Sequence, residues 1–449
     1  MNLFVLVYLL LIIMLGFGST MVWRGNIILL MLLPASEFFG FVDPMKIAVK
    51  GAFDVHALIA LIIIAAILVS SHKINNLIKS QFFLPISMFF LFWLYGVLCP
   101  WISGDSSLFY SLKASKEFLS IFAFVAVLLF TKTKKDVDLG WKYLVGLGIY
   151  YSILEILGQV IGPFLKANMT YHMRGEDVFF WKIYAPFWPV ILIALYKPYY
   201  EYAQDVSRPF VKLGLSAIGL LLTFFRSYLL AAFVALPSIL LICGNGISKT
   251  FIRTTLFAFT ICFCLVVLAF MSFTIGNDFA SINKITDKFV FSAVKEITTN
   301  TGGSLRGREK VAESRERLLE KRPYFGYGFI DKDSKFGRSS RRVIIGDNLG
   351  FIDMGLLDIS IKFGNVGFII MVLNVLYVIA ILVRMNKRYE DKKFKARCMA
   401  LAAVSMTYLF VLPVHAPFTY SYGLLPLGIS LGLIERERII LTEERHPSS

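Results

Sequence analysis

Long apolar runs alternate with short polar segments along most of the chain. A membrane-spanning helix needs about 20 mostly apolar residues, and runs of that length predict roughly thirteen spans, or twelve if one of the first two does not cross. The predicted spans begin near Asn2, Asn26, Asp54, Phe82, Glu117, Trp141, Phe179, Val211, Ser227, Thr254, Leu349, Ala396 and Tyr420. The pattern therefore predicts an all-α polytopic membrane protein.

One long stretch, residues 275–347, interrupts this pattern with polar and charged side chains. Within it, the spacing of apolar side chains predicts an amphipathic helix from Gly307 to Lys321. Pro323 then ends the helix, and Gly326 and Gly328 predict a turn. An amphipathic helix needs an apolar surface to lie on, so we expect this stretch to lie against the mouth of the helical bundle.

The interruption divides the chain into three predicted parts. Residues 1–274 hold about ten spans, and residues 348–449 hold about three spans and a short cytoplasmic tail. Residues 275–347 form a large, partly helical loop between them. Composition supports the membrane assignment, because 57% of the residues are hydrophobic and the mean hydropathy is +0.70.

The positive charge indicates which side each loop occupies. The chain has a formal net charge of +16, and most of the excess lies in short segments between apolar runs, which is typical of cytoplasmic loops. We therefore expect no binding to nucleic acid. The basic segments are residues 72–81, 131–142, 197–212, 244–253, 384–397 and 435–449. If these are cytoplasmic, the outer segments are residues 103–115, 165–181, 275–347 and 413–420, with a tight turn at Ser227. Thirteen spans then place the N-terminus outside, and twelve place it inside.

The large outer loop is itself basic, with fifteen Lys and Arg against ten Asp and Glu. Loops longer than about 60 residues do not follow the orientation rule, and an anionic partner is one reason for basic charge there. All five cysteines lie in or beside apolar runs, and the chain carries no nucleotide-binding, nucleophile-elbow or zinc-protease motif. We expect no disulfide framework, no metal site and no cofactor.

Four places put charged side chains at the predicted outer face: Arg174, Arg226, Arg308 and the pair Asp347-Asn348. Arg226 is the most informative, because a charge within apolar sequence costs at least about 2.5 kcal/mol at mid-bilayer. Arginines that converge on one face suit a phosphate or pyrophosphate, whose oxygens accept paired hydrogen bonds from guanidinium groups. The alternative for Arg226 is a side chain that extends from a helix end to the lipid headgroups.

Two residues are candidates for proton transfer. Asp347 stands where the chain returns to the membrane after the large loop, and it could act as a general base toward a sugar hydroxyl. An Asp before an apolar helix is also an ordinary N-cap, and the two roles are compatible. His415, in the outer segment 413–420, is a spare candidate base, although a lone histidine is usually solvated or structural.

Taken together, these places resemble the O-antigen polymerase and O-antigen ligase family of bacterial envelope assembly. The similarity covers roughly residues 174–367 and rests on the order and spacing of short motifs. The motifs are Arg174-Gly175, Thr223-Phe224-Phe225-Arg226, Arg308, Pro323-Tyr324-Phe325-Gly326-Tyr327-Gly328, Asp347-Asn348 and Gly364-Asn365-Val366-Gly367. In the second motif Phe225 stands where the family usually has serine, and Ser227 follows instead.

The resemblance implies a metal-independent, GT-C-like glycosyltransferase built from membrane helices. It would lie in a bacterial cytoplasmic (inner) membrane with its active site facing the periplasm or the outside. The implied donor is a glycan on undecaprenyl pyrophosphate, whose pyrophosphate Arg226, Arg308 and less directly Arg174 would bind. Further candidates for contact with the substrate are Asn348, Tyr327 and His415. The implied partners are a lipid-linked oligosaccharide as donor and acceptor, membrane lipid and a chain-length regulator protein.

One departure from the family separates two functions within it. Ligases typically have histidine where Asp347 stands, and that histidine is held to activate the lipid A-core acceptor. The difference favours a polymerase, whose acceptor is another lipid-linked repeat unit, with a ligase as the alternative. A flippase for the same lipids is a third interpretation. It would need charge spread along a central path, whereas the polar residues here concentrate on one side.

Overall fold

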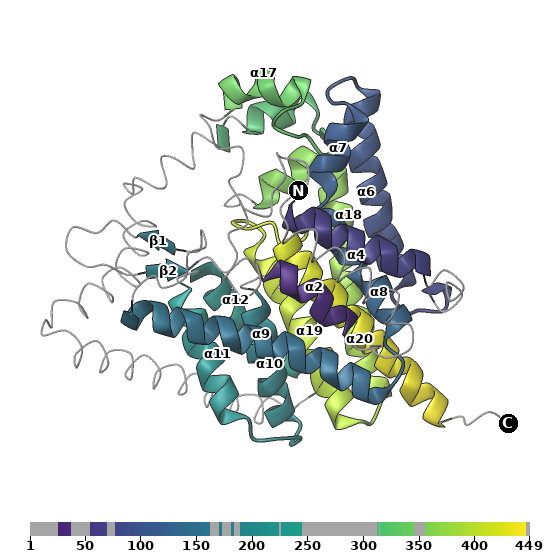
Figure 1. Cartoon of the computed structure of the whole chain (residues 1–449), viewed down its shortest axis with the longest axis vertical. Coiled ribbons are helices and arrows are strands. Elements are labelled where there is room, and N and C mark those ends of the chain that lie inside the picture. Colours follow the sequence, from purple (N-terminus) through teal and green to yellow (C-terminus); the bar gives the residue numbers. More distant parts are fainter. Residues whose placement is uncertain are drawn as a thin grey trace, which may run out of the picture.

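The computed structural model is almost entirely helical in the part of the chain that it describes. The described residues are 26–36, 54–69, 77–161, 170–172, 181–183, 189–223, 226–244, 312–313, 315–344 and 355–445. Among them, one short antiparallel pair joins β1 (Thr170–His172) to β2 (Trp181–Ile183). The prediction of an all-α polytopic membrane protein is confirmed (Figure 1).

Three of the described helices are each long and apolar enough to cross a membrane: α6, α18 and α19. In chain order the helices are α2 (Ile27–Ala35), α4 (Val55–Val69), α6 (Phe83–Ile102), α7 (Leu108–Ser115), the 3-10 helix η2 (Phe118–Phe122), α8 (Ala123–Phe130), α9 (Lys134–Ile161), α10 (Val190–Ala203), α11 (Phe210–Leu222), α12 (Arg226–Ile242), α17 (Lys335–Ile344), α18 (Gly355–Arg388), α19 (Lys392–Val411) and α20 (Ser421–Arg445). The predicted runs near Asn2 and Thr254 lie outside the described residues, so the full count of spans stays a prediction.

Several helices begin where the hydropathy pattern predicts them. Helices α2, α4, α6, α11, α12 and α20 each start within one residue of the predicted position. Helix α9 starts before the apolar run near Trp141, because Asp136 accepts a hydrogen bond from the N–H of Thr133 at 2.9 Å and the Thr133 hydroxyl accepts from the N–H of Asp136 at 3.2 Å. Helix α19 also starts before its apolar run, with Asp391 as its N-cap. Caps made by charged residues therefore lengthen helices beyond their apolar runs.

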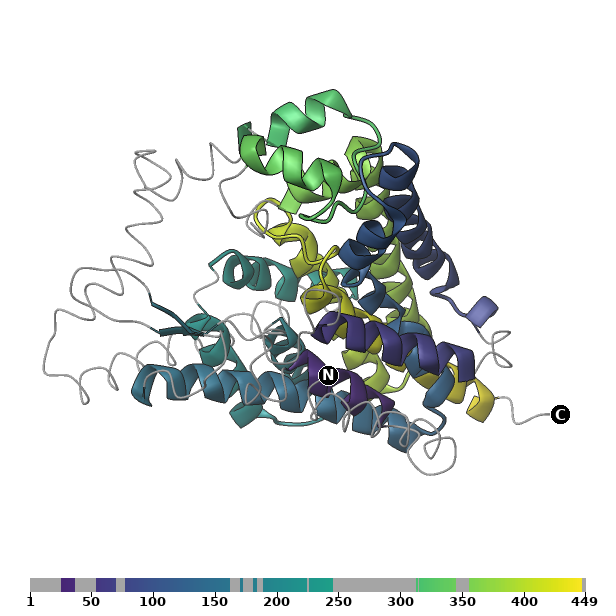
Figure 2. The ribbon, with the colours of Figure 1, turned by 45° about the horizontal axis from the view of Figure 1, so that its top comes forward.

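Helices from before and after the large loop form one bundle. Helix α19 packs against α10, α12 and α18, while α20 packs against η2 and α8. Figure 2 shows these yellow-green C-terminal helices between the teal helices and the blue ones. In the most apolar window of α19, 78% of the residues are buried, compared with 39% for α6. Helix α19 is therefore central, and α6 leaves much of its surface uncovered by the rest of the protein.

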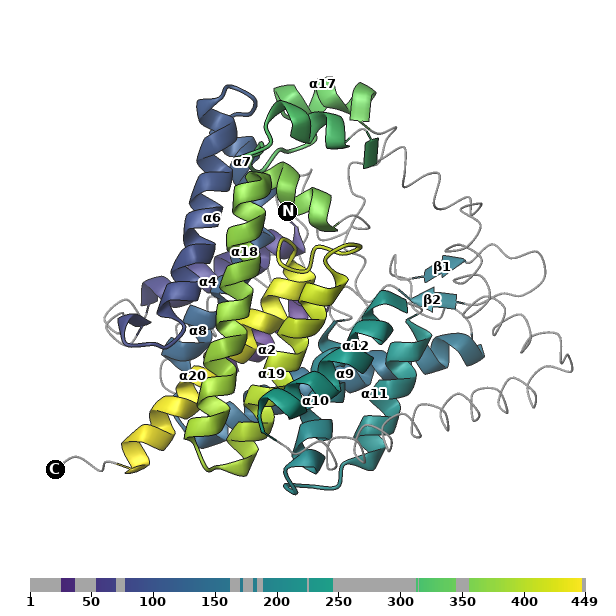
Figure 3. The ribbon, with the colours of Figure 1, turned by 180° about the vertical axis from the view of Figure 1, so that it is seen from behind.

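The predicted inner and outer segments gather at opposite ends of the long helices. At one end, α7 and α17 lie beside the end of α6 and the start of α18 (Figure 3). At the other end, the basic segments pair with acidic residues: Lys393 lies 2.9 Å from Asp138, and Arg397 lies 2.6 Å from Glu437 and also pairs with Asp138. The segments named here that share a predicted side therefore also share an end of the bundle.

Candidate functional site

The end of the bundle that the sequence predicts to face outward holds three of the predicted site residues: Arg226, Tyr327 and His415. Arg226 is the first residue of α12, so it lies at the positive end of that helix. The predicted residues that lie outside the described part are Arg174, Arg308, Asp347 and Asn348.

His415 lies between α19 and α20, beside the start of α12. Its ring centroid is 5.0 Å from that of Tyr228, two residues after Arg226. The side chain is 6% exposed, and its backbone N–H donates to the carbonyl of Val411 at 2.7 Å. The carbonyl of His415 faces Gly355, where an added Cβ would approach it to 2.0 Å. The starts of α12 and α18 therefore meet at this segment, and the burial of His415 favours a packing role over that of an exposed base.

A turn of the large loop, the outer turn (Pro323–Gly328), packs against α18. The N–H groups of Tyr327 and Gly328 donate to the carbonyls of Ile361 and Lys362 at 2.7 and 2.8 Å. In an unbroken helix those carbonyls would accept from N–H groups four residues further along. The outer turn therefore replaces two helical hydrogen bonds of α18.

Gly364 supplies the break in α18 that permits this exchange. Its backbone has φ 70° and ψ 177°, a conformation that is essentially restricted to glycine. The N–H groups of Asn365 and Val366 donate to the carbonyls of Pro323 and Tyr324 at 2.8 and 3.3 Å. Polar backbone groups within an apolar bundle need partners of this kind. Two motifs that are separate in the sequence thus form one backbone-paired unit.

The glycines of the outer turn are required by backbone conformation and by close contact. Gly326 and Gly328 have φ values of 68° and 73°. A Cβ at Gly326 would lie 2.5 Å from the carbonyl oxygen of Ile361, and a Cβ at Gly328 would lie 2.5 Å from that of Gly96. The predicted turn is confirmed, and its glycines allow the chain to pass between α6 and α18.

Phe329, directly after the outer turn, anchors it in the bundle. It is 2% exposed, and its N–H donates to the carbonyl of Gly96 at 2.7 Å. Its ring centroid lies 5.5 Å from that of Phe118 and 5.6 Å from that of Phe363. Burying a phenylalanine side chain stabilises a fold by about 1.5–3 kcal/mol. This anchor could not be recognised from motif spacing.

Tyr327 is buried within the outer segment, with 3% of its surface exposed. Its hydroxyl donates to the carbonyl of Leu318 at 3.1 Å, its ring stacks on Phe336 at 4.9 Å, and the guanidinium of Arg322 lies 4.7 Å from the ring centroid. Burial raises the pKa of the Tyr327 hydroxyl, so it remains a donor. These contacts give Tyr327 a positioning role, and contact with substrate stays a prediction.

Two sets of ion pairs, the outer clasp, fasten the large loop to α7 and to the connection before it. The Nζ atom of Lys113 lies 3.2 Å from Asp331 and 3.1 Å from Asp333, and Arg322 lies 2.7 Å from Asp105. The hydrogen bond from Lys113 lowers the pKa of the Asp333 carboxyl, so it stays ionised at neutral pH. The clasp holds this part of the loop against the end of the bundle where α6 ends and α7 begins.

Replacing Lys113 by Met should loosen the clasp, because the Asp331 side chain, only 10% exposed, would lose its partner. We expect faster proteolysis between residues 331 and 338, measured by trypsin digestion of the detergent-purified protein. The double variant with Asp331→Asn should recover part of the protection, with a coupling of about 0.5–3 kcal/mol. The exposed Lys79, which lies before α6, provides the matched Lys→Met control. Equal digestion of the Lys113 and Lys79 variants would refute this role.

A second polar cluster, not predicted from the sequence, lies at the start of α18. The carboxylate of Asp358 accepts hydrogen bonds from Lys362 at 2.7 Å, from the Thr419 hydroxyl at 3.1 Å and from the Tyr420 hydroxyl at 3.3 Å. Lys362 also lies 4.3 Å from the ring centroid of Tyr420. These contacts fix the segment before α20 against α18. The only signal in the sequence was a pair of opposite charges four residues apart inside an apolar run.

Residues 212–372 match the O-antigen ligase family. This region contains Arg226, Arg308, Asp347, the outer turn and the Gly364 break, and it begins after Arg174. The match supports the resemblance to O-antigen polymerases and ligases. No match was found among curated proteins.

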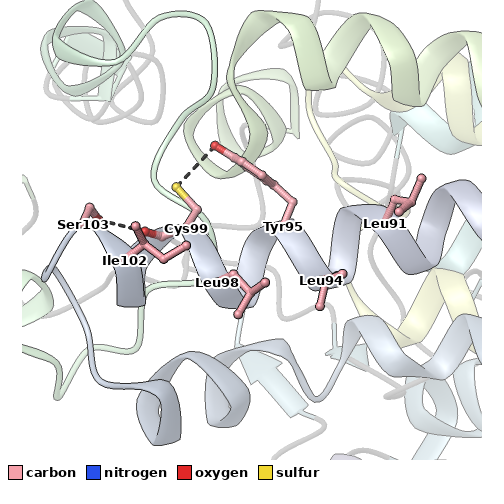
Figure 4. A pocket seen from close by; sticks show the side chains of 7 residues that line it. All are labelled: Leu91, Leu94, Tyr95, Leu98, Cys99, Ile102 and Ser103. Atoms are coloured by element: carbon pink, nitrogen blue, oxygen red, sulfur yellow. Dashed lines mark hydrogen bonds between the residues drawn. The ribbon is translucent and has the colours of Figure 1, made fainter.

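An apolar strip of α6 borders the region that matches the O-antigen ligase family. Figure 4 shows the Tyr95 hydroxyl directed toward the sulfur of Cys99, at 3.3 Å. The same hydroxyl donates to the carbonyl of Phe325 in the outer turn at 2.6 Å. The other side chains of this shallow pocket are Leu91, Leu94, Leu98, Ile102 and Ser103. The strip thus reaches the outer turn through Tyr95.

Among the described residues, no group of three or more His, Cys, Asp or Glu side chains is placed to hold a metal ion. The chemistry that these residues offer is hydrogen bonding, ion pairing and proton transfer. The region that matches the O-antigen ligase family contributes the paired backbone and the start of α12. Outside it, His56 of α4 lies 3.9 Å from Glu117 and 2.9 Å from Ser421 of α20.

Proposed function

We propose that this protein polymerises lipid-linked oligosaccharide repeat units at the outer face of a bacterial cytoplasmic membrane. Donor and acceptor would both be glycans on undecaprenyl pyrophosphate. The observation that carries the proposal is the match to the O-antigen ligase family, because it spans Arg226, Arg308 and Asp347. The described residues of that region support the proposal in two ways. The outer turn is hydrogen-bonded to α18, and Tyr228, near Arg226, packs against His415.

In this mechanism Arg226 and Arg308 bind the donor pyrophosphate and stabilise the charge that develops as it leaves. The N-terminus of α12 adds its positive dipole at Arg226. The acceptor hydroxyl oxygen forms a bond to the anomeric carbon, while the bond from that carbon to the pyrophosphate breaks. Asp347 positions or deprotonates the hydroxyl. Membrane lipid and a chain-length regulator would be further partners.

The predicted loop helix would cover this site. Its described part is helical and ends at Lys321, directly before Arg322 and Pro323. Arg315 within it is 4% exposed, so this helix packs onto the protein. If it extends back as predicted, it carries Arg308 two turns earlier. The arrangement supports a lid that brings Arg308 toward the mouth.

A ligase is the second candidate, because the matching family is described as O-antigen ligase. The chemistry at the donor would be the same, and the acceptor would be a lipid A-core or another carrier. The two functions differ in the product that accumulates when the protein is missing.

A gel of surface polysaccharide from a strain lacking this protein, beside a complemented strain, separates the candidates. A polymerase predicts single repeat units that become a ladder on complementation. Long chains that remain on the lipid carrier would instead establish the ligase. A carrier-linked single unit that stays on the cytoplasmic side would favour the flippase and overturn both.

A further inference from the structure

One face of α18 is exposed along the helix and changes from apolar to basic near its end. Beyond the break in α18, the exposed residues recur every three or four positions, which is one face of a helix. In the apolar part of this face, Ile369 and Leu373 are 56% and 58% exposed. The same face continues with three exposed basic residues, here called the basic end of α18: Arg384, Lys387 and Arg388.

The other face of α18 is packed, which fixes the direction of the exposed face. Met371, Val375 and Leu382 are buried, and α19 lies along the helix. The side-chain amide of Asn374 donates to the carbonyl of Pro85 in α6 at 3.2 Å. The exposed face therefore points away from the bundle, and the rest of the protein leaves it uncovered.

The length of the apolar part places the basic end at the depth of lipid headgroups. Helix α18 is long and apolar enough to cross a membrane. Val366, the first exposed apolar residue after the break, lies eighteen residues before Arg384, or about 27 Å at 1.5 Å per residue. The hydrocarbon core of a bilayer is about 30 Å thick. With the apolar part in the hydrocarbon, the basic end reaches the headgroup layer on the predicted cytoplasmic side, opposite α17 (Figure 3).

The carboxylates at this end of the bundle are paired with other basic residues. The pairs are Lys134 with Asp391, Lys393 with Asp138, and Arg397 with Asp138 and Glu437. Among the described residues, the basic end takes part in no ion pair. The exposed carboxylate nearest to it in the sequence is Glu390, on the connection to α19. Three positive charges are thus left for a partner from outside the bundle.

The spacing of the three basic residues brings like charges together. Lys387 and Arg388 follow Arg384 by three and four residues, so all three are neighbours on the helix surface, where like charges destabilise a helix. The negative end of the helix dipole offsets this for Lys387 and Arg388 in the last turn, whereas Arg384 lies a turn earlier. A phosphate among them would remove the repulsion and accept paired hydrogen bonds from the two guanidinium groups.

We infer that the basic end of α18 binds the phosphate of an anionic phospholipid, whose acyl chains lie along the exposed apolar face of the same helix. The two parts of the face identify the ligand together. A free phosphate would use only the basic part, and a neutral lipid would use only the apolar part. The inference is independent of the proposed glycosyl transfer.

The test measures lipid binding to the purified full-length protein in neutral detergent. The probe is phosphatidylglycerol with a fluorescent acyl chain. Unlabelled phosphatidylglycerol should displace it, whereas phosphatidylcholine and glycerol phosphate should not. The triple variant Arg384→Gln, Lys387→Gln and Arg388→Gln should bind about 100-fold more weakly, since each basic residue near an anionic lipid surface contributes about five-fold. About 0.5 M NaCl should also weaken binding by the wild type.

A second triple variant controls for net charge. Lys79→Gln, Lys142→Gln and Arg208→Gln remove the same charge from exposed residues in three separate elements. This variant should bind like the wild type, and an equal loss of binding would overturn a site on α18. Displacement by phosphatidylcholine would overturn the preference for an anionic headgroup, and displacement by glycerol phosphate would show a free-phosphate site instead. If the first triple variant melts below the wild type, salt decides: wild-type binding that NaCl leaves unchanged overturns the ionic contact.

Discussion

Arg226→Ala should reduce the formation of long chains by about 100-fold or more, the usual cost of removing a group that stabilises charge in a transition state. Arg226 begins α12, two residues before Tyr228, whose ring lies 5.0 Å from that of His415. The loss should affect chemistry rather than insertion, because the apolar residues of α12 that follow Arg226 are unchanged. Polysaccharide gels of complemented deletion strains measure chain length, and immunoblots of membranes measure the amount of protein.

Two further variants sharpen this test. Arg226→Lys keeps the charge without the paired hydrogen bonds of a guanidinium, so its activity should be intermediate. Arg208→Ala, at an exposed arginine in the connection before α11, should leave chain length unchanged. Arg308→Ala should behave like Arg226→Ala. Normal chains from both alanine variants at normal protein levels would exclude pyrophosphate binding by these arginines.

The helices and their grouping could be predicted because both depend on local properties. The lengths of the apolar runs located the starts of six α-helices to within one residue. The basic residues assigned the loops to two sides. The turn at Gly326 and Gly328 was also predictable, since glycine is the residue that takes positive φ without steric cost. The early start of α9 was missed, because its Thr133–Asp136 capping box lies outside the apolar run.

The contacts that build the mouth could not be predicted, because they join residues far apart in the sequence. Nothing local indicates that Tyr327 donates to Ile361, or that Phe329 fills the space above Gly96. The pair of His56 and Glu117 comes from elements about sixty residues apart, and its Ser421 partner lies at the start of the last helix. Single charged residues beside apolar runs are common at helix ends. The sequence alone therefore does not show which of them lie together in the folded protein.

The Gly364 break should tolerate no side chain, so Gly364→Ala should destabilise the protein and detach the outer turn. A non-glycine residue in this conformation costs about 1–3 kcal/mol. In addition, the new Cβ would lie 2.0 Å from the carbonyl oxygen of Tyr324 and 2.3 Å from the backbone nitrogen of Phe325. Backbone atoms cannot rotate away, so the outer turn must shift and its hydrogen bonds to α18 must lengthen or break. We expect the melting temperature in detergent to fall by about 5 °C or more.

Glycines elsewhere in the bundle provide matched controls for Gly364→Ala. An added Cβ at Gly146 in α9 or at Gly214 in α11 meets nothing within 4 Å. Alanine at these helical positions should therefore be neutral or stabilising, by about 0.5–1 kcal/mol. Gly364→Ala should also expose residues 323–328 to proteolysis, which neither control should do. A Gly364 variant as stable and as protected as the controls would show that the break in α18 does not hold the outer turn in place. Loss of both stability and long chains in Gly364→Ala is the expected result. It would show that the hydrogen bonds between α18 and the outer turn hold the loop in its working position.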